Sequence, residues 1–90
     1  MKILHLTLKK KWFDMILSGE KTEEYREIKP YWTKRLFKDY THVKFRNGYS
    51  KNAPSFTIEL KGIFTGIPNH KWADSASEVV YILKLGEIVH

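Results

Sequence analysis

The sequence predicts a small α+β fold, in which short strands form a mixed β-barrel and one or two helices pack beside it. The chain has 90 residues, enough for one small domain with a limited core, so residues 1–90 are treated as a single domain. Most apolar residues alternate with polar ones at the period of a strand, and few stretches show helical spacing. Strands and helices do not alternate regularly along the chain, which argues against a parallel sheet.

The first two elements are a strand and a helix. Residues 2–8 have the period of a strand, and both of its faces include apolar side chains. A strand that is apolar on both faces is predicted to lie in the centre of the sheet. His5 lies on this strand and is expected to be a structural histidine with satisfied hydrogen bonds. Residues 10–18 carry apolar side chains at helical spacing, namely Trp12, Phe13, Ile16 and Leu17. Gly19 follows, at the point where a helix C-terminus favours a residue that adopts left-handed geometry.

The rest of the chain is predicted to be mostly extended. Residues 21–26 form an extended segment, and Pro30 suits the first turn of a short helix that ends near Phe37. Three later strands are predicted, over residues 42–46, 56–61 and 79–85. Asn47 and Gly48 form the turn between the first two of these strands. All five glycines are expected at turns or caps: Gly19, Gly48, Gly62, Gly66 and Gly86.

Composition excludes several classes of protein. Hydrophobic residues make up 42% and charged residues 29% of the chain, as in ordinary globular domains and unlike disordered or membrane-spanning chains. The first lysine cluster follows the short apolar segment at the N-terminus, the reverse of a signal peptide, so we expect a cytoplasmic protein without a membrane partner. The absence of cysteine excludes disulfides, thiol catalysis and thiolate metal sites. The four histidines lack ligand spacing, so neither a metal nor another cofactor is predicted.

The positive charge is concentrated in one segment. Net charge is +6, and residues 29–51 contain seven basic residues against one acid, so this segment holds the whole excess. A surface of this kind attracts polyanions, although it can also serve only solubility. The basic residues that we expect to contact nucleic acid are Lys34, Arg35 and Arg46.

Aromatic residues interleave with these charges. Bases can stack on exposed rings, and Trp32 and Trp72 lie in polar stretches that favour partial exposure. One of these tryptophans is expected to cover a cleft and stack a base. Phe37 and Phe45 are instead expected in the core, as most phenylalanines in small domains are.

The stretch GEKTEEYR, residues 19–26, places a lysine, three carboxylates and an arginine next to a helix cap. In a regular strand Thr22, Glu24 and Arg26 share one face, and Tyr25 lies on the opposite face, where a core position is expected. Lys21 is still in the turn and can swing toward Glu24. A buried cluster of this kind must pair its charges, and such clusters often mark sites. Glu24 and Arg26 form either a structural ion pair or direct ligand contacts, and Thr22 bonds either a ligand or its own backbone.

The motif G-x-K-x-x-E-x-R at residues 19–26 resembles the signature of ASCH domains, a family related to PUA-like barrels. A helix that ends in I-L-x-G precedes it, and YILKLGEI at residues 81–88 is similar to the closing strand of the family. The resemblance implies a PUA-like barrel of five or six strands with one or two flanking helices. It also implies a cleft that binds RNA or a nucleotide through Lys21, Thr22 and Arg26, beside the basic face.

Some ASCH proteins look like enzymes, including an amidohydrolase for N4-acetylcytidine and proteins described as ribonucleases. In the amidohydrolase the motif lysine is the proposed nucleophile or base, assisted by a threonine and a later acid. This chain keeps the lysine as Lys21, has Glu24 where the threonine would lie, and offers Asp74 or Glu78 as the later acid. A carboxylate beside Lys21 is expected to raise the pKa of its amine, which favours binding over catalysis.

Two alternatives to a binding module stay open. The first is a small metal-independent hydrolase in which Lys21 is base or nucleophile, Glu24 moves a proton and Arg26 stabilises an oxyanion. The second is a protein-interaction domain in which the cleft has no ligand.

Overall fold

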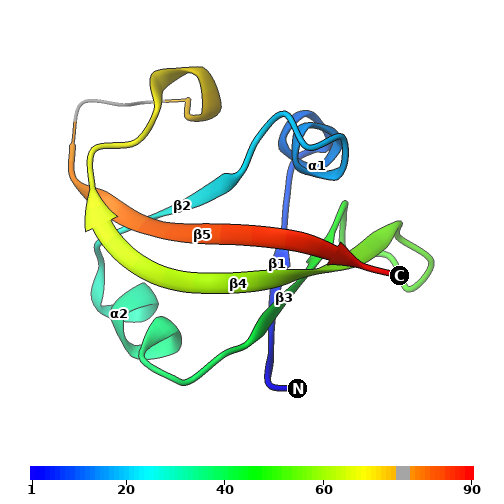
Figure 1. The fold of residues 1–90 in the computed structure, drawn as a ribbon, viewed down its shortest axis with the longest axis horizontal. Helices are drawn as coiled ribbons and strands as arrows, with labels where there is room; N and C mark the ends of the chain where they lie inside the picture. Colours follow the sequence, from blue (N-terminus) through cyan, green and yellow to red (C-terminus); the bar gives the residue numbers. More distant parts are fainter. Residues whose placement is uncertain (75–77) are drawn as a thin grey trace.

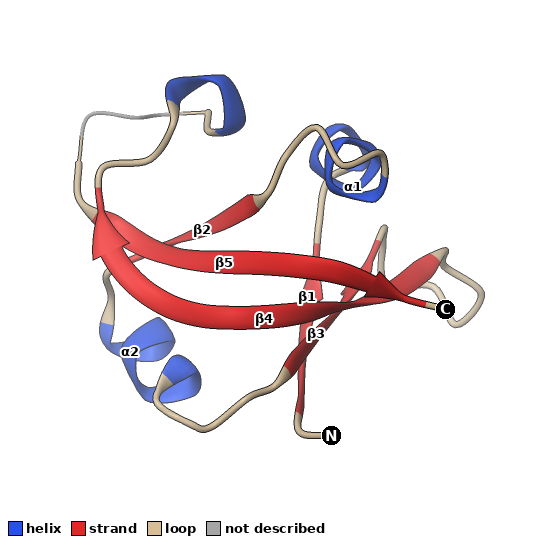
Figure 2. Cartoon of the chain, in the orientation of Figure 1, coloured by secondary structure: helices blue, strands red, loops and turns tan. Residues whose placement is uncertain are grey.

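The computed structural model describes residues 1–74 and 78–90 and shows a small α+β fold (Figures 1 and 2). A five-stranded mixed sheet curls into a half-barrel, and two helices lie on different sides of it. The elements in chain order are β1 (Ile3–Thr7), α1 (Lys10–Leu17), β2 (Glu23–Glu27), α2 (Pro30–Leu36), β3 (His42–Arg46), β4 (Ser55–Gly66), a 3-10 turn η1 (His70–Trp72) and β5 (Val80–Val89). Each strand and helix predicted from the pattern of apolar residues is therefore present.

The strand order is β1-β3-β4-β5-β2, with β1 parallel to β3 and the other pairs antiparallel. The prediction that β1 is a central strand is wrong, because β1 forms one edge of the sheet. Leu4 and Leu6 are buried while His5 is exposed, so the strand covers the core with one face only. His5 is accordingly a surface side chain and not a core histidine.

The core fills the concave side of the sheet, beneath α1. The helix contributes Trp12, Phe13 and Ile16. Leu17, the fourth apolar residue at helical spacing, is instead 45% exposed. Phe13 packs edge-on against Phe56 of β4, with 4.9 Å between the ring centroids. Strand β3 adds Val43 and Phe45, both fully buried. Burial of these aliphatic and aromatic side chains is the main force that holds the curled sheet together.

Phe37 was expected in this core, and that prediction is wrong, because its side chain is 81% exposed. Helix α2 ends at Leu36, which is buried, and Phe37 adopts the non-helical dihedral angles φ −81° and ψ 60°. The change of backbone direction turns the Phe37 ring to the outside. The spacing of apolar residues along a helix does not predict this exposure, because Phe37 is the C-cap residue and lies outside the regular helix.

The last two strands are longer than the sequence predicts. β4 continues to Gly66 and β5 to Val89, so Gly62, Gly66 and Gly86 lie inside strands and not at turns. A Cβ atom on Gly86 would lie 2.6 Å from Glu59 Oε1, and one on Gly62 would lie 2.8 Å from the ring of Phe64. Gly86 therefore permits close approach between β5 and β4, and Gly62 leaves room for the ring of Phe64 on its own strand.

Two glycines behave as predicted. Gly19 and Gly48 have φ values of 87° and 109°, in the region that favours glycine.

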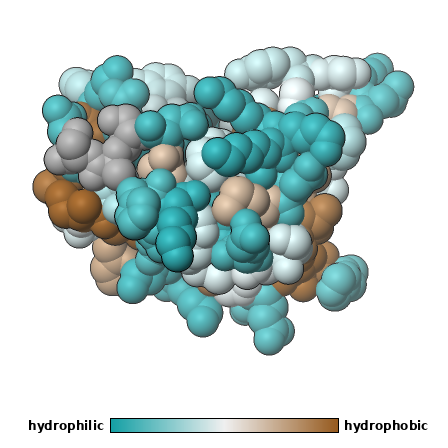
Figure 3. All heavy atoms as spheres, turned by 90° about the horizontal axis from the view of Figure 1, so that it is seen from above, coloured by the Kyte–Doolittle hydropathy of each residue, from teal (hydrophilic) through white to brown (hydrophobic). Residues whose placement is uncertain are grey.

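Among the described residues no helix is long and apolar enough to cross a bilayer. The face that carries α1 and η1 is mostly polar, with apolar areas mainly toward its margins (Figure 3).

Candidate functional site

The residues of the 19–26 motif come together because the chain reverses sharply after α1. Ser18 caps the helix and Gly19 takes the left-handed conformation. The backbone N–H of Lys21 then donates to the carbonyl of Met15 at 2.9 Å, which folds Lys21 back beneath the helix. Its side chain therefore reaches the face of β2 that carries Glu24, as the sequence suggested for a lysine still in the turn.

Glu24 lies between two cations. Lys21 Nζ donates to Glu24 Oε1 and Arg26 Nη2 donates to Glu24 Oε2, each at 2.8 Å. Lys21 and Glu24 are only 2% and 5% exposed. Arg26 Nη2 also donates to the carbonyl of Thr7 at 3.3 Å, and within the described chain its buried Nε finds no partner. We call Lys21, Glu24 and Arg26 the charged triad.

Aromatic rings surround the two cations. Lys21 Nζ lies 4.3 Å from the ring centroid of Trp12 and 5.6 Å from that of Tyr25. The guanidinium of Arg26 lies 4.9 Å from the ring centroid of Trp32. Rings at these distances attract a cation through their electron-rich faces, which offsets part of the cost of removing it from water.

Burial lowers the pKa of Lys21 below its ordinary value. The carboxylate of Glu24 acts in the opposite direction, through its charge and its hydrogen bond, and the charge of Arg26 adds to the lowering. The expectation that the neighbouring carboxylate leaves the pKa of Lys21 raised is therefore wrong. Glu24 does raise the pKa of Lys21, but the loss of water around the buried amine is the larger effect.

A cleft of about 630 Å³ opens beside the charged triad. Tyr25 and Trp72 form part of its wall, and Asp74 and Glu78 line it as well. The two acids proposed as counterparts of a later catalytic acid thus face the same space as Lys21. The charged side chains that line the cleft are Lys9, Lys21, Glu24, Arg26, Glu27, Asp74 and Glu78. Carboxylates outnumber cations among them, so the cleft itself is not positive.

Tyr25 was expected in the core but is half-buried in the wall of this cleft. Its hydroxyl donates to Glu23 Oε1 at 2.7 Å and accepts the backbone N–H of Asn69 at 3.0 Å. Burial, together with the hydrogen bond to Glu23, raises the pKa of Tyr25 to about 12. Tyr25 therefore connects β2 to the segment that leads into η1 and holds that wall of the cleft in place.

The other predicted contact residues lie elsewhere. Thr22 is exposed and borders a separate hollow near the end of α1, while its carbonyl accepts the N–H of Leu85 at 3.0 Å. Lys34 is exposed on α2, whereas Arg46 ends β3 and donates to the carbonyl of Ser50 at 2.6 Å. In Figure 1, α2 and the loop after β3 lie at opposite ends of the sheet. The basic residues of the 29–51 segment are thus divided between two regions.

Arg35 and Trp32 have a role that the sequence did not suggest. The guanidinium of Arg35 donates to the carbonyl of His5, while that of Arg26 donates to the carbonyl of Thr7. Both guanidinium groups lie against Trp32, with Arg35 at 5.5 Å from the ring centroid. β3 pairs with one edge of β1, and the two arginines bind backbone carbonyls on the other edge. They form a side-chain seam between β1, β2 and α2.

No protein-family model matches the sequence, and no curated protein or solved structure matches it significantly. Among residues 1–74 and 78–90 no group of three or more histidine and carboxylate side chains is arranged to hold a metal ion.

Proposed function

We propose that this chain is an ASCH-like domain of the PUA-like type, and that the cleft beside the charged triad binds a nucleobase or nucleoside, free or within RNA. The observation that carries the proposal is a buried ammonium and a partly buried guanidinium, both fixed by one carboxylate and both lining an aromatic-walled cleft. Lys21 has three N–H donors and Glu24 takes one of them. The remaining donors suit a carbonyl oxygen such as those on base edges.

The charge of the cleft favours an uncharged ligand group over a phosphate. Three cations and four carboxylates line it, and a phosphate would face the exposed acids Asp74 and Glu78. A neutral base has no such penalty and can stack on Tyr25 or Trp72. In this proposal phosphates of a bound RNA lie outside the cleft, where Lys34, Arg35 and Arg46 are the candidate contacts.

The test compares Lys21→Met with Lys11→Met. Both lysines lie near the ring of Trp12, at 4.3 Å and 4.5 Å, but Lys11 is exposed and Lys21 is buried. Binding of a panel of uncharged nucleosides and short single-stranded RNAs is followed by tryptophan fluorescence. Lys21→Met is expected to weaken binding about tenfold or more, since it removes a charged hydrogen-bond donor to the ligand, and Lys11→Met to leave binding unchanged. Equal affinity of the two variants would contradict the proposal.

A hydrolase is the second candidate, and the lowered pKa of Lys21 favours it. A buried amine with a lowered pKa is a better base and nucleophile at neutral pH, and Asp74 and Glu78 supply carboxylates at the same cleft. Acylated cytidines and single-stranded RNA are incubated with the protein and a chelator, and products are followed by mass spectrometry. Product from the parent but not from Lys21→Met would establish catalysis. Binding without product would leave the first candidate alone.

A further inference from the structure

Half of β4 has no strand on one side. β3 pairs with β4 only from Ser55 to Glu59, whereas β5 accompanies β4 as far as Gly66. The N–H of Leu60 donates to the carbonyl of Thr41 at 3.0 Å. Beyond Leu60, the described part of the chain offers no hydrogen-bond partner to the backbone groups of residues 61–66 that point away from β5. Because alternate residues of a strand point their backbone groups to opposite sides, this leaves a short unpaired edge.

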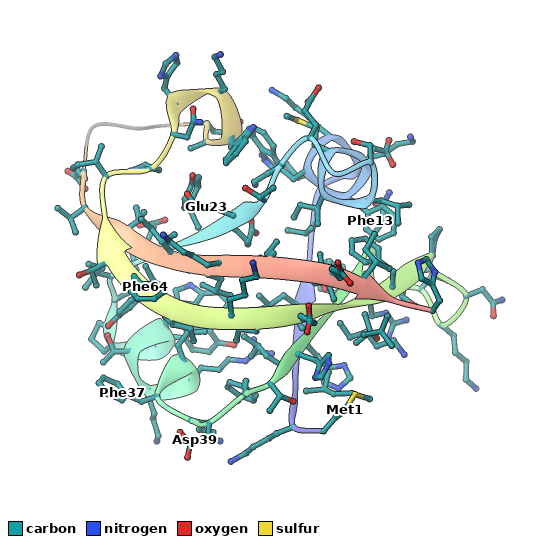
Figure 4. The ribbon with its side chains drawn as sticks, viewed as in Figure 1. Met1, Phe13, Glu23, Phe37, Asp39 and Phe64 are labelled. Atoms are coloured by element: carbon teal, nitrogen blue, oxygen red, sulfur yellow. The ribbon has the colours of Figure 1, made fainter. Side chains whose placement is uncertain are left out.

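A groove of about 770 Å³ runs along this edge, between β4 and the end of α2. Leu60 and Ile63 contribute to its apolar lining, and Tyr81 of β5 lies at its inner side. Phe37 and Phe64 border it with side chains that are 81% and 51% exposed. Figure 4 shows the two phenylalanines at the same end of the molecule, one on β4 and one just after α2. Large aromatic side chains left in water beside an open edge are typical of an interaction surface.

The border of the groove is positive. Lys38 lines the groove, Lys34 lies on the other side of Phe37, and Lys84 Nζ lies 5.3 Å from the ring centroid of Phe64. Asp39 is the acid that lines it. In residues 1–74 and 78–90 these three lysines make no ion pair. Their charges remain available to a partner.

We propose that this groove binds an extended peptide segment of a partner protein, which adds to β4 as a further strand and carries acidic residues. The unpaired N–H and C=O groups of residues 61–66 recur along β4 at strand spacing, and another extended backbone can satisfy them in register. Alternate side chains of that peptide would enter the apolar groove between Phe37 and Phe64. Acidic side chains between them would meet Lys34, Lys38 and Lys84. RNA could use the rings and the lysines but could not satisfy the edge in register, so the peptide fits better.

The test begins with a library of random eight-residue peptides displayed on phage and selected on the parent protein. We expect the enriched peptides to have apolar residues at every second position and aspartate or glutamate between them. Their affinity should fall about tenfold or more in Phe37→Glu and in Lys38→Glu, because both place a carboxylate against an acidic ligand. Tyr49→Glu is the matched control, because Tyr49 is 92% exposed and lies in the loop at the other end of the sheet.

Amide hydrogen exchange then locates the bound peptide. An enriched peptide should slow the exchange of alternate amides in residues 61–66, and a version with N-methylated backbone amides should not. Selection without enrichment, or peptides that bind equally to Phe37→Glu and Lys38→Glu, would overturn the proposal. So would protection of these amides that grows with protein concentration alone, which would indicate a second copy of the chain. Protection by single-stranded RNA but by no peptide would likewise overturn it and assign the groove to nucleic acid.

Discussion

Glu24 uses both carboxylate oxygens at once, one for Lys21 and one for Arg26. Glu24→Gln would leave two buried or partly buried cations without an anion between them. Removal of one partner from a buried ion pair typically destabilises a protein by about 3–5 kcal/mol, and we expect a loss of that order in the free energy of unfolding. Urea unfolding of the variant and the parent measures it.

The control for this change is Glu27→Gln on the same strand. Glu27 is exposed and pairs with exposed Lys29 at 3.0 Å, so the loss should be below about 1 kcal/mol. If Glu24→Gln unfolds no more easily than Glu27→Gln, the charged triad does not stabilise the fold, and its arrangement would have to be explained by ligand binding alone.

Lys21 and Tyr25 should have opposite effects on the pH dependence of stability. The pKa of Lys21 is lower in the folded chain, so between that value and the ordinary 10.5 the unfolded state holds more protons and stability rises with pH. The pKa of Tyr25 is raised from 10 to about 12, so over that interval the folded state holds the extra proton and stability falls with pH.

Urea midpoints measured at alkaline pH should therefore show a rise and then a fall in the parent protein. We expect Lys21→Met to remove the rising part and Tyr25→Phe to remove the falling part, because each variant lacks one titrating group. A rising part that persists in Lys21→Met would mean that another group is responsible. Lys21→Met should also remain folded, since Arg26 still neutralises Glu24.

The seam between β1 and β2 depends on arginine side chains and not on a strand ladder. Arg35 donates to the carbonyl of His5 and to the hydroxyl of Tyr31 at 3.2 Å, and it lies against Trp32. Lysine has no planar fork with which to make these contacts together. We expect Arg35→Lys to destabilise the protein by about 1.5–3 kcal/mol, as for the loss of a charged hydrogen bond.

The same change should expose the edge of β1 to other molecules, since an uncovered strand edge is a template for association. Sedimentation at increasing protein concentration measures this, with Lys34→Ala on the same helix as the control because Lys34 is exposed. Arg35→Lys that stays monomeric and as stable as the control would show that the seam does not protect β1.

The sequence was sufficient to predict most elements, because their local signals are strong. The helical spacing of Trp12, Phe13 and Ile16 and the left-handed Gly19 gave α1 and its end. The order of the strands was not predictable in this way. Residues 3–7 have the apolar pattern of a central strand, yet they form an edge whose acceptors two arginines cover. Such contacts join residues far apart in the sequence, and no local pattern records them.

The charged triad was predictable from the 19–26 motif, but its surroundings were not. The pKa of Lys21 depends on burial beneath Trp12, and the fold alone brings that ring to the lysine. Asp74 joins the same cleft because η1 brings its segment across β2, where Asn69 binds Tyr25. The family resemblance offered Asp74 as a partner for Lys21, but no local pattern groups either residue with Trp12. The fold brings the three side chains to one cleft.

For the whole molecule, the excess of positive charge lies outside the cleft, which carries three cations and four carboxylates. Two modes of binding should therefore respond differently to salt. An uncharged nucleoside in the cleft releases no counterions, so its affinity should change little between about 50 and 500 mM salt. A single-stranded RNA that also contacts the basic residues should lose affinity steeply over this range.

Each phosphate contact adds to the slope of log affinity against log salt, by roughly 0.7 for a single strand. Lys34→Ala should lower that slope by about this amount if the RNA follows α2, and Arg46→Ala should do so if it follows the loop after β3. Because these regions lie at opposite ends of the sheet (Figure 1), a short RNA should be sensitive to one change and not to both. Nucleoside affinity should be unaffected by either. A nucleoside whose affinity falls with salt as steeply as that of RNA would place a charge contact inside the cleft. That result would contradict the division between a cleft without excess positive charge and a basic exterior.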